Sequence, residues 1–317
     1  SYSVTGVQTC ALPIFRTRRM ANCFPNSSYH TVNWSVYDAF TSGAINTVGD
    51  TICGNGDPSL IGSDTVASGG DNVISYQWQS SSVNSSTGYS NIIGATNATH
   101  DPPTGLTITT WYRRLAKDGT CNTTLTASSG VWQVTVRELF TAGAINTTGE
   151  TICYNGNPSL IGNATDASGG DNIISYQWQS STTNSSSGFA DIGSATQSTY
   201  DPPDGLTVTT WYRREAKDGT CSMSFTTSSG VWKVTVHDNF DAGEIDPFGE
   251  TICYNGDPEE IQSITDASGG DEVISYKWQS SANGTFTDAI DIVSATGTSY
   301  NPDRKSTRLN SSHRIRS

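Results

Sequence analysis

The chain has 317 residues, with 30 acidic against 17 basic side chains and a formal net charge of −13 at pH 7. A chain this acidic repels phosphate backbones and anionic lipids, so we expect no nucleic-acid partner and no membrane insertion. No stretch approaches the roughly 20 apolar residues of a membrane-spanning helix. Abundant Ser, Thr, Asn and Gly, together with eight Trp, indicate an extracellular β-protein rather than a disordered chain.

The two ends of the chain differ in composition from everything between them. Val4–Ile14 can be back-translated into a DNA string whose reverse complement encodes Asp303–His313 residue for residue. That string also resembles a sequencing adapter. We therefore predict that residues 1–15 and 303–317 are adapter-derived and contribute nothing to the fold, and that the natural protein continues past both.

An internal repeat of one hundred residues dominates the interior. "FTSGAINTVGDTIC" begins at Phe40, "FTAGAINTTGETIC" at Phe140 and "FDAGEIDPFGETIC" at Phe240. This period has the size of a domain and is too long for a solenoid repeat. The predicted units are the last strands of an earlier repeat at 16–39, complete repeats at 40–139 and 140–239, and the first part of another repeat at 240–302.

Taken in chain order, each complete repeat contains three clear strand patterns. In "VISYQWQS" at 73–80, apolar residues such as Tyr76 and Trp78 alternate with polar ones, which predicts a half-buried strand. "TITTWYRRLA" at 107–116 is rich in Thr and aromatic residues, which favours a second strand. "GVWQVTV" at 130–136 alternates again and predicts a third.

Turn signals separate these strands. "ASGGDN" at 67–72, "DPPTG" at 101–105 and "KDGTC" at 117–121 contain the Gly, Pro and Asp residues typical of turns. No window shows the 3.6-residue period of a helix. Short strands with a turn about every ten residues predict an all-β chain of tandem β-sandwich domains of the immunoglobulin-like class.

Five ordered segments carry a resemblance to a known family. They read "TICYNGDP", "ISYQWQSS", "TYDPPDGLT", "TWYRREAKDGTC" and "VWKVTV". Over residues 16–302 the chain resembles the Ig-like/PKD-like tandem repeats of very large surface adhesins in gliding-type Gram-negative bacteria. The resemblance implies export and a stalk or adhesion role, and it carries over no catalytic residues.

The cysteines recur in register with the repeat. Two of them per repeat in an exported chain predict one disulfide per domain, Cys53–Cys121 and Cys153–Cys221. Cys253 has no partner within its own shortened repeat. A structural zinc site is the alternative, but it normally uses close ligand pairs such as CxxC, which do not occur here.

A Trp–Tyr pair recurs in the predicted central strand of both complete repeats. In a strand, one member of each pair must point outward. We predict that these aromatic residues mainly serve packing. If a glycan-binding platform exists, its candidate residues are Trp111, Tyr112, Trp211 and Tyr212.

Charged residues offer weaker signals. Asp71 and Asp118 lie in predicted turns and are expected to bond backbone groups there. Weak calcium binding is the alternative role for these aspartates, although calcium needs six to eight oxygen ligands. We predict no other cofactor. The histidines, such as His100, do not recur between copies, which favours surface positions and no catalytic site. Arg113 and Arg114 are expected to form local salt bridges.

Three functions fit these observations. The first is a non-catalytic spacer in an exported surface adhesin, with neighbouring repeats as its partners and cell-surface glycans or proteins as possible targets of the whole protein. The second is an array of carbohydrate-binding modules. The third is the accessory region of a secreted enzyme whose catalytic domain lies elsewhere.

Overall fold

The computed structural model describes residues 15–17, 30–32 and 36–302. Almost all of the two predicted adapter-derived segments therefore lies outside the described residues. The chain divides into two compact units, Ser1–Leu139 and Phe140–Ser317. Before the first complete repeat, β1 (Phe15–Thr17) pairs antiparallel with β2 (His30–Val32).

One six-stranded sheet forms the larger layer of the first complete repeat. Its strands are β5 (Asp50–Cys53), β8 (Ser75–Ser81), β9 (Ser90–Asn91), β10 (Thr110–Lys117), β11 (Thr126–Ala127) and β12 (Trp132–Arg137). The strand order is β5-β12-β10-β8-β9, and β11 pairs with β10. Only β5 and β12 are parallel; the other pairs are antiparallel. The three strands predicted from alternation correspond to β8, β10 and β12 and are confirmed.

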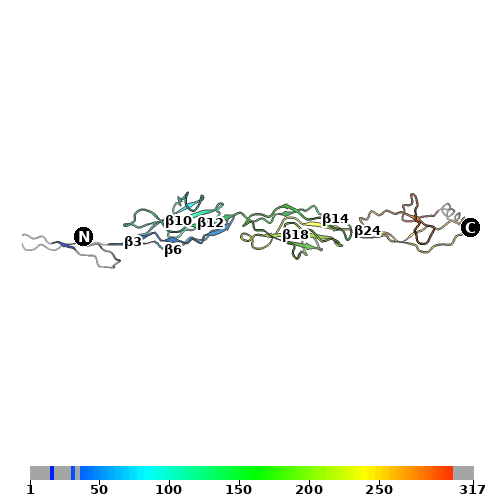
Figure 1. Ribbon diagram of the computed structural model, residues 1–317, viewed down its shortest axis with the longest axis horizontal. Coiled ribbons are helices and arrows are strands. Elements are labelled where there is room, and N and C mark those ends of the chain that lie inside the picture. Colours follow the sequence, from blue (N-terminus) through cyan, green and yellow to red (C-terminus); the bar gives the residue numbers. More distant parts are fainter. Residues whose placement is uncertain (1–14, 18–29, 33–35, 303–317) are drawn as a thin grey trace, which may run out of the picture. The chain divides into compact units, whose positions relative to one another are not determined.

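Two short strand pairs form the second layer. β3 (Asp38–Thr41) pairs with β7 (Ser68–Gly70), and β4 (Ala44–Ile45) pairs with β6 (Ser63–Thr65). Figure 1 labels β3 and β6 of this layer and β10 and β12 of the larger sheet. Ile45 from β4 packs in one core with Trp78, Tyr112 and Val134 of the larger sheet. The repeat is therefore a two-layered β-sandwich.

The second repeat has the same architecture. Its larger sheet contains β14 (Glu150–Ile152), β16 (Ser175–Ser181), β17 (Ala190–Asp191), β18 (Thr210–Lys217), β19 (Thr226–Thr227) and β20 (Trp232–Val236). The order β14-β20-β18-β16-β17, with β19 on β18, matches the first repeat. β13 (Ala144–Ile145) pairs with β15 (Asn163–Thr165) as β4 pairs with β6.

The third repeat has only small strand pairs in its described part. They are β21 (Asp238–Asp241) with β24 (Ser268–Gly270), β22 (Glu244–Ile245) with β23 (Ser263–Thr265), and β25 (Gln279–Ser280) with β26 (Ile290–Asp291). Up to residue 302 it contains no counterpart of β18 or β20, the strands that complete the sheet in the second repeat.

A stack of aromatic rings fills the centre of each complete sandwich. Trp78 is fully buried, and its indole Nε1–H donates to the Asn97 carbonyl over 2.9 Å. His100 stacks on Trp78 with ring centroids 5.4 Å apart and also lies against Tyr112. The expectation of a surface position for His100 was therefore wrong. Tyr200 takes the same place in the second repeat, so the site needs a flat ring rather than an imidazole.

Candidate ligand-binding surface

The central strands β10 and β18 alternate strictly between buried and part-exposed residues. Tyr112 and Tyr212 point inward and are each only 2% exposed. Trp111 and Trp211 occupy the outward positions and remain partly accessible. The four predicted platform residues thus separate into two layers, and only the two tryptophans could touch a ligand.

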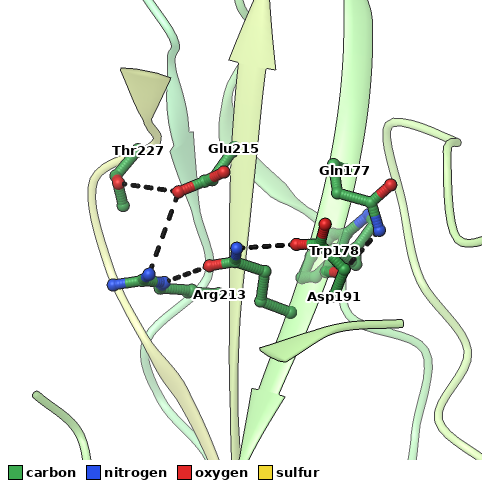
Figure 2. Close-up of polar contacts among 7 residues, drawn as sticks. Gln177, Trp178, Asp191, Arg213, Glu215 and Thr227 are labelled. Carbon is green, nitrogen blue, oxygen red and sulfur yellow. Dashed lines mark hydrogen bonds and ion pairs between the residues drawn. The ribbon is translucent and has the colours of Figure 1, made fainter. Parts of the chain in front are cut away.

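Several polar side chains contact one another on the outward face of the second repeat (Figure 2). Arg213 Nε donates to Gln179 Oε1 over 2.6 Å, and Gln179 Nε2 donates to Asp191 Oδ1 over 2.7 Å. Arg213 also forms an ion pair with Glu215, at 3.8 Å. Its guanidinium lies 4.3 Å from the centre of the Phe189 ring. These groups therefore contact one another across neighbouring strands of the sheet.

The first repeat has different chemistry on the same face. Arg113 donates to Gln79 over 2.7 Å and lies 4.1 Å from the centre of the Tyr89 ring, so the arginine–aromatic contact is shared. Asn91 and Leu115, however, replace the two carboxylates Asp191 and Glu215. The predicted salt bridge is therefore present at Arg213. Arg113 instead donates a hydrogen bond to the side-chain amide of Gln79 and packs against the Tyr89 ring.

The second arginine of each pair is buried rather than salt-bridged. Arg114 donates through Nε to Ser128 Oγ over 3.1 Å and through Nη1 to the Ala98 carbonyl over 2.8 Å. Its guanidinium lies 4.8 Å from the Tyr76 ring centre. Burial lowers the pKa of Arg114, but arginine still stays charged. The expectation of a salt bridge at this position was wrong, because neutral oxygens and a ring surround the inward side chain.

The aspartates have the predicted backbone-bonding role. Asp71 accepts the Val73 N–H over 2.9 Å and the Thr120 hydroxyl over 2.6 Å, and this hydroxyl bond leads the interactions that lower its pKa. Asp118 is buried and accepts the Asn122 N–H over 2.7 Å. Within residues 36–302, no group of three or more His, Cys, Asp or Glu side chains is arranged to hold a metal ion.

The predicted disulfides within repeats are not formed. Cys53 and Cys221 are each disulfide-bonded, whereas their predicted partners Cys121 and Cys153 are free and exposed. Membership in a disulfide is thus confirmed for two of the four cysteines, and both pairings are wrong.

The strand register explains why these pairings fail. Cys53 lies opposite Arg137 of β12. Along β12, Arg137 comes three residues after Val134, which pairs with Thr110 at the start of β10. Cys121 follows Lys117, at the other end of β10. The two cysteines are separated by about ten residues along the sheet, or roughly 30 Å at about 3.3 Å per residue. A disulfide needs Cα atoms within about 7 Å.

The topology and shared cores define the class of protein: a tandem array of immunoglobulin-like β-sandwich repeats. The chain belongs to the family described as "Domain of unknown function (DUF8696)", whose model matches residues 41–138, 141–238 and 242–315. The last match extends into the segment predicted to be adapter-derived, whose origin stays a prediction. No curated protein matches the sequence.

Similar solved structures include tandem Ig-domain proteins. The I-band fragment I67–I69 of titin has a TM-score of 0.44 and 12% identity, with 83% of each chain covered. Murine CEACAM1b has a TM-score of 0.31 and 12% identity, covering 61% of this chain and 98% of its own. Sidekick-1 immunoglobulin domains 1–5 have a TM-score of 0.30 and 10% identity, covering 85% and 54%. In the described part of our chain, no helix has the length and apolar character needed to cross a bilayer.

Proposed function

We propose that the chain is a non-catalytic spacer region of an exported surface protein, which extends an adhesive or other functional domain from a bacterial cell. The observation that carries the proposal is the contrast between the two faces of the central strand. The inward residues Tyr112 and Arg114 recur as Tyr212 and Arg214 with the same kinds of partners. The outward acidic groups do not recur, as expected if folding alone constrains the repeat.

The buried polar groups support the same proposal. Arg114 and Arg214 are fully enclosed, so their charge cannot contact an anionic substrate without opening the sandwich. Both oxygens of the Asp71 carboxylate accept hydrogen bonds from backbone or hydroxyl donors, and Oδ1 of the buried Asp118 accepts the Asn122 N–H. Disulfide bonding of Cys53 and Cys221 supports export, because disulfides persist in oxidising compartments.

A carbohydrate-binding array is the second candidate. The part-exposed ring of Trp211 favours it, with the Lys233 ammonium 5.6 Å from the ring centre. A sugar would have to displace or share this cation–π contact. In the first repeat, Gln133 stands at the position of Lys233, so the two copies would not present the same subsite.

The test is a binding screen of the full chain, with Cys53 and Cys221 kept in their disulfide-bonded state, on a broad glycan array with and without calcium. The spacer proposal predicts no saturable binding under either condition. Trp111→Ala and Trp211→Ala serve as matched variants on the first and second repeats. Saturable binding that is lost in either variant would replace the spacer proposal with the carbohydrate-binding one.

A further inference from the structure

His100 occupies a ring position that all three repeats build in the same way. Its backbone N–H and carbonyl exchange hydrogen bonds with Ile61, over 3.1 and 2.8 Å. The same two bonds, over 2.8 to 3.1 Å, hold Tyr200 in the second repeat and Tyr300 in the third. The fold therefore fixes the backbone at this position, and only the identity of the ring changes from repeat to repeat.

Aromatic rings enclose the imidazole of His100 on two sides. Its ring centroid lies 5.4 Å from that of Trp78 and 5.4 Å from that of Tyr112, and both neighbours are buried. Although part of the His100 residue reaches solvent, its Nε2 atom is buried and has no hydrogen-bond partner. A charge on this side of the ring would therefore have neither water nor a protein acceptor to compensate it.

Protonation of His100 would place a hydrogen-bond donor at this buried atom. A neutral imidazole carries one N–H, whereas the imidazolium carries an N–H on both nitrogens. In the cation, Nε2 would hold a buried donor without an acceptor, which costs free energy that the neutral ring avoids. Burial accordingly lowers the pKa of His100 from its ordinary value of 6.5, and the neighbouring Asp101 carboxylate opposes this with a smaller rise in the pKa.

The segments packed against this imidazole contribute no acidic side chain. On β8 the titratable residue is Tyr76, whose ring faces the Arg114 guanidinium. On β10, Tyr112 stays neutral near neutral pH because burial raises its pKa to about 12. Arg114 shares the inward face of β10, and its positive charge opposes a second cation in this core, while the other two cations of β10 alternate to the outward face. Residues 58–62 have no titratable side chain.

The second repeat provides a built-in comparison. Tyr200 lies between Trp178 and Tyr212, with ring centroids 5.6 Å from each. Burial raises the pKa of Tyr200 above its ordinary value of 10.0, so this ring keeps its proton from neutral to mildly acidic pH. The two complete repeats thus share the aromatic stack and differ in whether its middle ring changes charge in that range.

We propose that His100 makes the first repeat an acid-sensitive element of the chain, in which protonation of the imidazole loosens the aromatic core while the second repeat stays closed. Well above a pH of about 6.5 the ring is neutral in the folded and the unfolded chain, so it contributes no pH dependence there. As the pH falls through this value, the unfolded chain takes up a proton that the folded core resists. The stability of the first repeat therefore falls until the folded ring is protonated as well.

Hydrogen exchange of the full chain at about pH 7.5 and about pH 5 tests the proposal. The Trp78 and Trp178 amides are matched probes, because each donates to an alanine carbonyl, of Ala95 or Ala195, over 2.9 Å. Each rate is divided by that of an unstructured peptide of the same sequence at the same pH, which removes the intrinsic effect of pH on exchange. We expect the protection of Trp78 relative to Trp178 to fall at least about threefold at the lower pH. An unchanged ratio would overturn the proposal.

Two reciprocal variants assign the effect to this ring. His100→Tyr gives the first repeat the ring of the second and should abolish the fall at Trp78, whereas Tyr200→His should produce a fall at Trp178. A fall at Trp78 that persists in His100→Tyr would overturn the proposal. An NMR titration of the unaltered chain does not depend on the folding of any variant: the His100 imidazole should protonate below a pH of about 6.5, and protonation at or above that value would also overturn the proposal. These outcomes are separate from glycan binding, which tests the spacer proposal.

Discussion

Ile145 and Ile245 occupy equivalent places in the second and third repeats, yet their environments differ. Ile145 is 1% exposed and Ile245 is 53% exposed. Trp178 is fully buried, whereas Trp278 is only part-buried, although both indoles donate to a backbone carbonyl over 2.9 Å. The shared segments build the same local hydrogen bonds in both places. The core itself requires β18 and β20, which close the sandwich in the second repeat.

The largest effect should come from opening the closed core. Trp178→Ala removes the buried ring at its centre and should lower the free energy of unfolding of the second repeat by about 3–5 kcal/mol. Trp211→Ala on the outward face should cost less than about 1 kcal/mol. Site-resolved hydrogen exchange measures both, with the first repeat as an internal reference. Equal losses in the two variants would contradict the assignment of inward and outward faces.

A smaller effect should come from the turn that contains Gly170. Its φ of +61° is unfavourable for residues with a side chain, and a Cβ would collide with the Asp218 carboxylate. Gly170→Ala should cost about 1–3 kcal/mol or more. In the third repeat the nearest atom to a Cβ on Gly270 is 3.7 Å away, so Gly270→Ala should cost less.

A control separates the collision from a general effect of alanine. Gly193 has open space around its Cβ position and no positive φ. Gly193→Ala should therefore change the stability of the second repeat by less than about 0.5 kcal/mol. If Gly170→Ala were equally mild, the close packing of Asp218 against this turn would be wrong.

Alkaline titration gives a third test of the closed core. Burial raises the pKa of Tyr112 and of Tyr212 to about 12, from an ordinary value of 10.0. Between these values the folded state keeps protons that the unfolded state loses, so stability should fall as the pH rises from about 10 to about 12. Tyrosinate absorbance near 295 nm reports the ionisation. Tyr212→Phe should weaken the pH dependence of the second repeat, and an unchanged profile would contradict the burial.

The smallest effect should come from the outward charges. Glu215→Leu gives the second repeat the residue of the first and removes the ion pair with Arg213. Because that pair is partly exposed, the change should cost less than about 1 kcal/mol in chemical denaturation. Leu115→Glu in the first repeat is the reciprocal control. A loss comparable with that of Trp178→Ala would mean that the outward face helps to specify the fold.

The sequence predicted the strands well because alternation reports directly on burial. The pattern around Trp78 identified β8, and its inward residues are the buried ones. The Gly-Gly-Asp turn was also predictable, since Asp and Gly have few other structural uses in that combination. Alternation also required Tyr112 and Arg114 to share one face, but an inward arginine is unusual enough that surface salt bridges were expected instead.

The cysteine pairing could not be obtained from recurrence alone. A constant spacing between Cys53 and Cys121 shows that both belong to each repeat, but it does not show at which end of the sandwich each lies. That depends on the parallel pairing of β5 with β12, a long-range contact without a local sequence signal. The packing of His100 was missed for a similar reason, because its stacking on Trp78 is also a long-range contact without a local sequence signal.

Backbone hydrogen exchange at Trp178 and Trp278 tests most directly whether the closing strands make the core. Both amides donate to equivalent carbonyls, Ala195 over 2.9 Å and Ala295 over 3.2 Å, so their local bonding is matched. If β18 and β20 supply the stability, the Trp178 amide should exchange only through global unfolding of its repeat, and the Trp278 amide at least a hundredfold faster. Equal protection of the two amides would contradict the account.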